Sequence, residues 1–96
     1  MIRFVIFFSF LLFAKFSFAD CSKAKDTSRI VVAGGSITET LFFLNESKNI
    51  VAVDTTSNYP EDAKKFPSIG YVRALSAEGV LSLNPTLIIG ENDMGP

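Results

Sequence analysis

The sequence predicts an α/β domain in which helices flank a parallel sheet. Three short runs of mainly β-branched and aliphatic residues are typical of buried strands, and helix-like segments separate them along the chain. Strands that alternate with helices favour a parallel sheet with right-handed crossovers. At 96 residues, with 48% apolar content and a formal net charge of −1, the chain has room for one small domain.

Residues 1–19 are expected to be a signal peptide for export to the periplasm. Arg3 gives a short positive start, an apolar run of about 11 residues follows from Phe4 to Ala14, and Ser17-Phe18-Ala19 has small residues where signal peptidase requires them. We therefore predict cleavage after Ala19. A membrane anchor is the alternative, but a spanning helix needs roughly 20 apolar residues, and Lys15 suits neither interpretation well.

Residues 20–28, DCSKAKDTS, are polar and are expected to form a flexible leader. Cys21 raises the option of a lipid anchor, which is disfavoured because Asp20, rather than a small residue, precedes it. A lone Cys has no partner for an internal disulfide, so Cys21 is interpreted as a tail residue without a role. The domain is then expected to occupy residues 29–96.

The first strand, Arg29–Ala33, is expected to end at Gly34-Gly35. Ser36 is followed three residues later by Glu39, which has the form of a capping box and predicts a helix from there to about Glu46. The apolar face of this helix would carry Ile37, Thr40, Leu41 and Leu44.

The second strand is expected at Asn49–Val53, followed by a long connection over residues 54–68 that contains a helical turn between Pro60 and Pro67. Residues 68–73 are expected to be extended or looped. Ser76 is a good N-cap for a helix that runs to about Leu83, and Thr86–Ile89 reads as the last strand. The sequence ends just after this strand, so we expect a fragment or a truncated reading frame of a longer protein.

Three loops follow strand ends and are expected to converge on one crevice, because ligands of parallel α/β folds bind at the carboxyl ends of the strands. These loops are residues 34–38, 54–59 and 70–75. The first loop lacks the spacing of a phosphate-binding loop, so Ser36 is interpreted mainly as a helix cap. The backbone amides beside it could still hold a ligand carboxylate. Tyr59, in the second loop, either lines a pocket or packs against Pro60.

Tyr71 and Arg73 make the third loop the most informative one. If the chain is extended there, both side chains project to the same side. A cation beside a phenol favours the phenolate, and tyrosinate is a known axial ligand of haem iron. The alternative is a half-buried aromatic ring beside a solvated Arg. Glu78 and Asp54 carry only weak signals, a surface Glu at a helix start and an Asp after a strand.

Several function classes are excluded by composition. The chain has no basic patch of the kind that a nucleic-acid-binding protein needs. With no His and one Cys, it cannot build a structural zinc site or a His-based catalytic relay. No nucleophile–base pair is visible, so an enzyme is not expected.

The segments GGSITETLFFLN and VAVDTTSNYPEDAKKFPSIGYVRALSAEGVLSLNPTLII resemble the N-terminal lobe of periplasmic haemin-binding proteins of bacterial ABC importers. Their class also includes binding proteins for ferric siderophores and vitamin B12. The resemblance runs from about Arg29 to Pro96, and IGYVRALSAEGVLSLNP is its most specific part. It implies two α/β lobes joined by a long helix with the ligand between them, so this chain would hold an incomplete N-terminal lobe.

The resemblance also implies roles for individual residues. Tyr71 would ligate the haem iron, Arg73 would donate a hydrogen bond to Tyr71, and Glu78 would dock onto the importer's permease. Ser36 and Tyr59 are candidates for lining the cleft. The expected function is capture of ferric haem as a transported ligand and its delivery to an ABC importer. The alternatives are binding of a siderophore or corrinoid, and a truncated, non-functional fragment.

Overall fold

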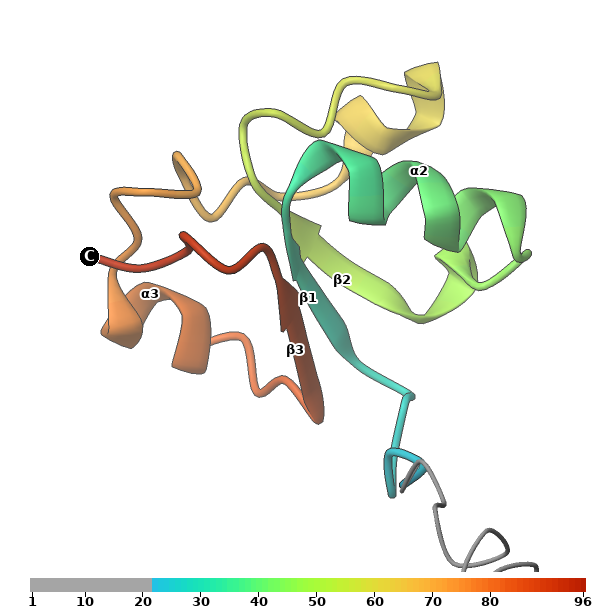
Figure 1. Ribbon diagram of the computed structural model, residues 1–96, viewed down its shortest axis with the longest axis horizontal. Coiled ribbons are helices and arrows are strands. Elements are labelled where there is room, and N and C mark those ends of the chain that lie inside the picture. Colours follow the sequence, from blue (N-terminus) through green and yellow to red (C-terminus); the bar gives the residue numbers. More distant parts are fainter. Residues whose placement is uncertain (1–21) are drawn as a thin grey trace, which may run out of the picture.

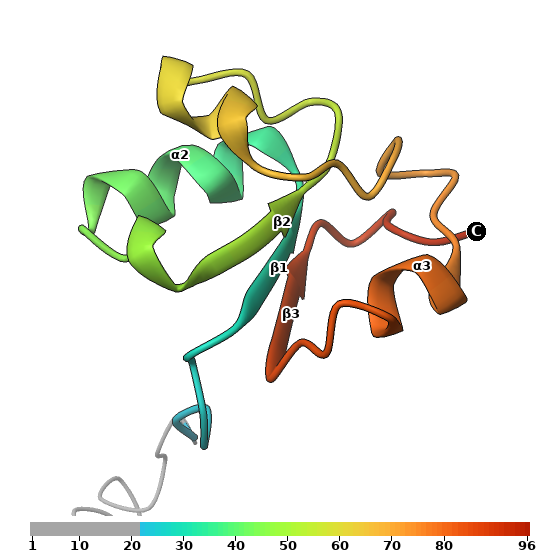
Figure 2. The same ribbon diagram turned by 180° about the vertical axis from the view of Figure 1, so that it is seen from behind.

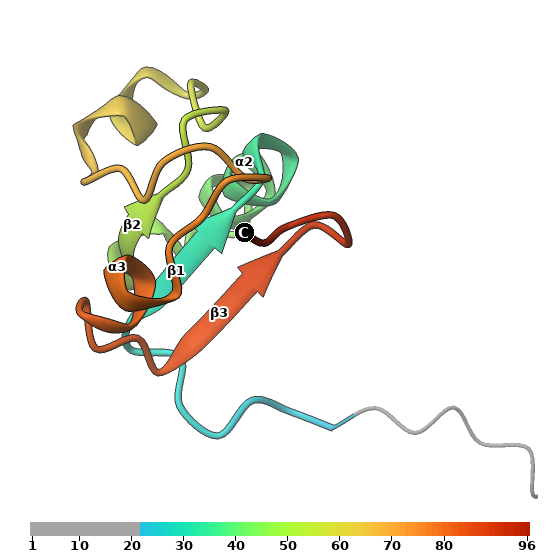
Figure 3. The ribbon, with the colours of Figure 1, turned by 90° about the vertical axis from the view of Figure 1, so that its left-hand side faces the viewer.

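Strand β1, Ile30–Ala33, forms the centre of a three-stranded parallel sheet in the computed structural model, which describes residues 22–96. β2, Ile50–Val53, pairs with one edge of β1, and β3, Leu87–Gly90, pairs with the other. Figure 3 shows the three strands running in the same direction. All three strands therefore have their carboxyl ends at one edge of the sheet.

The two α-helices of residues 22–96 cover opposite faces of the sheet (Figures 1 and 2). Helix α2, Gly35–Phe43, connects β1 to β2, and the short helix α3, Ala77–Leu81, precedes β3. Two 3-10 helices complete the described part of the chain: η2, Ser47–Asn49, and η3, Glu61–Lys65. This arrangement is the predicted parallel sheet with flanking helices.

The core consists of two layers, one on each side of β1. Because side chains alternate along a strand, Ile30 and Val32 point to one face and Val31 and Ala33 to the other, and all four are buried. The first pair packs with α2 and Phe66, and the second pair packs with α3 and the loop before it. A strand that is apolar on both faces is typical of a covered parallel sheet.

The predicted strands are confirmed to within a residue at each end, and Ser76 is confirmed as the N-cap of α3. Its side-chain oxygen accepts a hydrogen bond from the Gly79 amide at 3.2 Å. The helix is shorter than predicted and ends at Leu81. The helical turn predicted between Pro60 and Pro67 is η3.

The capping box predicted at Ser36 is wrong. The helix begins at Gly35, so Ser36 lies within the first turn, and the N-cap position is taken by Gly34 without a side-chain cap. The amides of Gly34 and Gly35 are instead satisfied from a distant loop, by Asp54 and Thr56. A local pattern could not show this, because the capping groups are about 20 positions away along the chain.

The predicted apolar face of this helix is only partly right. Ile37 and Leu41 pack against the core, and Phe42 joins them. Leu44 lies beyond the last helical residue, Phe43, and is 58% exposed, and Thr40 within the helix is also exposed. The extended or looped segment 68–73 is a loop, with one isolated parallel bridge from Ser68 to Val53.

The predicted signal peptide, its cleavage after Ala19 and Cys21 lie outside the described residues. Residues 22–29 are exposed and lead into β1. Within residues 22–96, no helix has the length and apolar content required to cross a membrane.

Candidate functional site

The carboxyl ends of the three strands bring together the loops in which the candidate residues lie. Gly34 follows β1, Asp54 follows β2, and Glu91 follows β3. The Asp54 amide donates to Val32 at 3.1 Å, and the Glu91 amide donates to Ala33 at 3.0 Å, so both loop starts are fixed to β1. The predicted convergence of the first two loops at this edge is therefore observed.

Asp54 is the most densely bonded side chain at this edge, and it is 2% exposed. Its Oδ1 accepts hydrogen bonds from the Gly34 amide at 2.9 Å and from the Ser57 hydroxyl at 2.8 Å. Its Oδ2 accepts from the amide of Thr56 at 3.1 Å and from the Thr56 hydroxyl at 2.5 Å. Burial raises the pKa of Asp54, but the hydrogen bonds from Thr56, Gly34 and Ser57 outweigh burial and hold the pKa below its usual value.

The hydroxyls around Asp54 extend this cluster to helix α2. Thr56 accepts a hydrogen bond from the Gly35 amide at 3.0 Å while its own proton goes to Asp54. Because Ser57 also donates to Asp54, the 2.7 Å contact between the hydroxyls of Thr38 and Ser57 has Thr38 as its donor. Asp54 thus joins the start of α2 to the loop after β2.

The loop that carries Tyr71 runs beside the Asp54 loop. The Thr55 amide donates to the Gly70 carbonyl at 2.9 Å, and the Ala74 amide closes a turn onto the Tyr71 carbonyl at 2.8 Å. The Gly95 amide donates to the Val72 carbonyl at 3.0 Å, so the segment after β3 also holds the Tyr71 loop. The third predicted loop is therefore also part of this edge.

Tyr71 is 47% exposed, so about half of the residue is accessible to solvent. The Arg73 guanidinium pairs with Asp93, with 2.8 Å between Nε and Oδ2. That ion pair uses Nε, and within residues 22–96 the two terminal nitrogens of Arg73 have no hydrogen-bond partner. They remain available to a phenolate or to a ligand carboxylate.

The other predicted site residues are exposed. Ser36 lies in the first turn of α2, and Tyr59, 70% exposed, lies in the connection between β2 and η3. Glu78 lies in the first turn of α3, on the opposite face of the sheet from α2. No hydrogen bond joins these three side chains to Tyr71 or Arg73 within residues 22–96.

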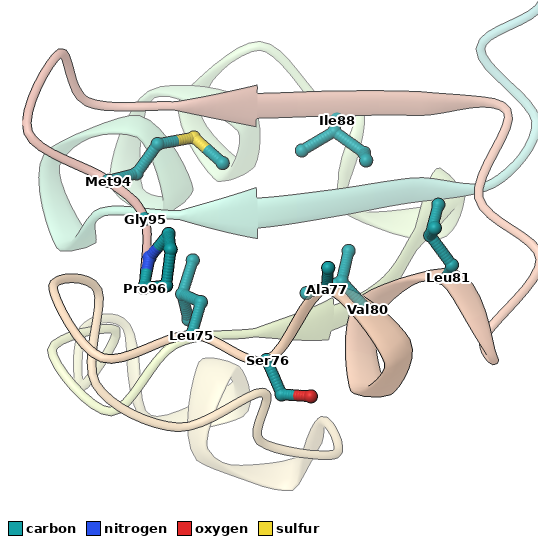
Figure 4. A pocket seen from close by; sticks show the side chains of 9 residues that line it. All are labelled: Leu75, Ser76, Ala77, Val80, Leu81, Ile88, Met94, Gly95 and Pro96. Carbon is teal, nitrogen blue, oxygen red and sulfur yellow. The ribbon is translucent and has the colours of Figure 1, made fainter.

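An apolar cavity of about 250 Å³ lies between α3, β3 and the segment after β3 (Figure 4). Ser76 is its one hydroxyl-bearing lining residue. A second cavity, about 220 Å³, lies between the Asp54 loop and η3. Tyr71 and Arg73 line neither cavity, so a ligand of Tyr71 would lie on the open edge of the sheet.

Residues 22–96 contain no group of three His, Cys, Asp or Glu side chains that could hold a metal ion. The Tyr71 phenol at this edge can supply a single hard oxygen ligand of the kind that ferric iron accepts. That donor set fits iron whose remaining positions are filled by another chelator, as in haem. It does not fit a bare ion.

Sequence reasoning underrated Asp54 and missed Asp93. The signal for Asp54 was present, since an Asp and four hydroxyl or amide residues directly follow a buried strand. Asp93 pairs with a residue 20 positions earlier, and no local pattern reports such a contact.

The family described as periplasmic binding protein matches residues 30–96. The structure is similar to the periplasmic heme-binding protein RhuT from Roseiflexus sp. RS-1, with a TM-score of 0.70 and 51% identity over 74% of this chain and 27% of that one. It is also similar to a periplasmic heme-binding protein from Pseudomonas aeruginosa, with a TM-score of 0.69 and 49% identity over 72% of this chain and 25% of that one.

A vitamin B12-binding protein from Yersinia pestis (strain Pestoides F) is 32% identical over 66 residues, which are 69% of this chain and 24% of that protein. The chain thus spans about a quarter of the length of the relatives that it matches.

Proposed function

The chain belongs to the periplasmic binding protein family, and we propose that its ligand is ferric haem, which it captures in the periplasm for delivery to an ABC-type importer. The single observation that carries this proposal is Tyr71, a half-exposed phenol on the loop at the carboxyl edge of the sheet. The identity levels also support it, since the two haem-binding structures are 51% and 49% identical to the chain and the B12-binding protein is 32% identical.

In this proposal Tyr71 binds the haem iron through its phenolate oxygen. Arg73 donates a hydrogen bond to that oxygen from a terminal nitrogen, while Asp93 holds its Nε. A hydrogen bond from a cation favours the charged form of its acceptor, so Arg73 would stabilise the phenolate that ferric iron requires.

Ser36 and Tyr59 would line the ligand cleft at the same edge, where both are exposed. Glu78 would contact the importer's permease. Its place in the first turn of α3 and its exposure leave the carboxylate free to meet a basic partner.

The proposal is tested by titrating the purified 96-residue chain with haemin and following the absorption spectrum. We expect saturable binding with a ferric tyrosinate spectrum. Tyr71→Phe should remove that spectrum and weaken binding by roughly tenfold or more, which corresponds to about 1.4 kcal/mol. Far-UV circular dichroism of each sample reports whether the variant is folded.

Tyr59→Phe is the matched control, because it removes the only other phenol of the chain. It should keep the tyrosinate spectrum, because only the phenol of Tyr71 is the proposed iron ligand. If the chain is folded and haemin binds equally to wild type and to Tyr71→Phe, the proposed iron ligand is wrong.

The B12-binding relative favours a corrinoid as the second candidate ligand. Titration with cyanocobalamin in place of haemin separates the two. Saturable cobalamin binding that is insensitive to Tyr71→Phe, without haemin binding, would replace haem by a corrinoid.

A further inference from the structure

The Asp54 carboxylate is buried at the point where three segments of the carboxyl edge meet. It accepts four hydrogen bonds, from the amides of Gly34 and Thr56 and from the hydroxyls of Thr56 and Ser57. All four partners are neutral donors, and an ionised carboxylate has the acceptor sites for all of them. The carboxylate thus fixes the turn that contains Thr55 to the start of α2.

This turn is in direct contact with the loop that carries Tyr71. The Thr55 amide, next in the chain to Asp54, donates to the Gly70 carbonyl at 2.9 Å. The Ile69 amide donates at 2.9 Å to the carbonyl of Val53, the residue before Asp54 in the chain. The backbone on both sides of Asp54 therefore holds the two residues that precede Tyr71.

Gly70 has φ of +97°, and a Cβ atom added there would meet nothing within 4 Å. Within residues 22–96, no side chain packs over Gly70, whose amide donates to the Ser68 hydroxyl at 3.1 Å. The hydrogen bond from the Thr55 amide to the Gly70 carbonyl is the contact that ties the peptide before Tyr71 to the Asp54 turn, while Ala74 and Gly95 hold the loop after it.

From these contacts we propose that Asp54 is the positioning residue for Tyr71. Its carboxylate orders the Thr55–Ser57 turn, the Thr55 amide fixes the Gly70 carbonyl, and Tyr71 follows. The inference rests on the proposed function only where it concerns haem. The link between Asp54 and the Tyr71 loop is a property of the ligand-free chain.

The ligand-free link is tested by amide hydrogen exchange of the full chain, comparing wild type with Asp54→Asn. The amide variant keeps the shape of the side chain but replaces one acceptor oxygen with a donor group. We expect exchange at Thr55 and Ile69 to accelerate at least tenfold, while Val31 and Val32 at the centre of the sheet change much less. Asp62→Asn, an exposed residue paired with Lys65, is the matched control and should leave all four amides unchanged.

Unchanged protection at Thr55, or an equal loss of protection at all four amides, would overturn the positioning role. If Asp54→Asn does not fold, Ser57→Ala takes its place, because it removes one of the four donors at a small side chain. Ser57→Ala should also accelerate exchange at Thr55 and Ile69 more than at Val31 and Val32, but by a smaller factor than Asp54→Asn. Unchanged exchange of the Thr55 amide in that variant would also overturn the inference.

The haem arm uses the same variants and the absorption spectrum of added haemin. Asp54→Asn should bind haemin about tenfold more weakly, with a reduced tyrosinate band, whereas Tyr71→Phe should lose that band altogether. Identical affinity and spectrum in wild type and a folded Asp54→Asn would contradict the positioning of Tyr71. If wild type binds no haemin, the proposed function fails, and the exchange result alone decides the link from Asp54 to Gly70.

Discussion

At the residue scale, the feature that most constrains this edge of the sheet is a buried carboxylate. Removing a charged group from water is unfavourable unless hydrogen bonds compensate for the lost hydration. The four donors around Asp54 provide that compensation, and no buried side-chain nitrogen or oxygen within residues 22–96 lacks a partner. Replacing any one of these donor residues would therefore leave the buried carboxylate less well compensated for its lost hydration.

The lowered pKa of Asp54 predicts how stability depends on pH. A carboxyl group whose pKa is lower in the folded than in the unfolded state contributes stability that is fully present above the unfolded value, about 4. That contribution is lost as the pH falls through the folded pKa. We expect the free energy of unfolding, measured with urea at a series of pH values, to fall below about pH 4 in wild type.

Asp54→Asn should show a flatter pH dependence over that range. Glu39→Gln is the matched control, because Glu39 is exposed and its carboxylate has no hydrogen-bond or ion-pair partner within residues 22–96. Its curve should follow that of wild type closely. Equal slopes for wild type and Asp54→Asn would show that Asp54 is not the group responsible.

Gly35 is predicted to tolerate no side chain. A Cβ atom at this position would lie 2.6 Å from the Thr56 carbonyl oxygen, and that backbone atom cannot move without disturbing the Asp54 turn. We expect Gly35→Ala to reduce the free energy of unfolding by about 1–3 kcal/mol in urea denaturation.

Gly79→Ala is the control for that substitution. A Cβ atom at Gly79 would make only an ordinary contact with Ser76, at 3.5 Å, and Ala is the better helix former. Its free energy of unfolding should equal or exceed that of wild type. Comparable losses in both variants would mean that the contact with Thr56 is not the cause.

At the scale of elements, sequence patterns located the strands well because each strand is a short apolar run bounded by Gly, Pro or polar residues. β1 could be recognised from RIVVA because it is apolar on both faces. The start of α2 was harder, since the capping groups of Gly34 and Gly35 come from another loop. Local patterns predict caps only where the capping side chain is itself local, as it is at Ser76.

Two serines test this distinction between local and distant capping. Ser76→Ala removes the bond to the Gly79 amide and should lower the free energy of unfolding by about 1 kcal/mol. Ser36→Ala should change it by less than about 0.5 kcal/mol, because Ser36 is exposed and caps no helix. Urea denaturation followed by circular dichroism measures both, and a larger loss for Ser36→Ala would restore the predicted capping box.

At the scale of the whole molecule, the parallel sheet gathers its functional candidates at one edge, because every strand ends there. Tyr71 and Arg73 could be named as candidates from GYVR, which has a phenol and a cation two residues apart, and their roles stay predictions. The groups that hold this loop could not. Asp54 acts through Thr55 on Gly70, and Asp93 reaches Arg73 from the segment after β3. Such contacts depend on the tertiary fold.

The central claim is that the Tyr71 phenolate binds ferric haem, and resonance Raman spectroscopy of the haem-loaded chain tests it most directly. Excitation in the tyrosinate-to-iron charge-transfer band should enhance phenolate ring vibrations in wild type and in Tyr59→Phe. Those vibrations should be absent in Tyr71→Phe. The same phenolate vibrations in Tyr71→Phe, or none in a haem-loaded wild-type chain, would contradict the account.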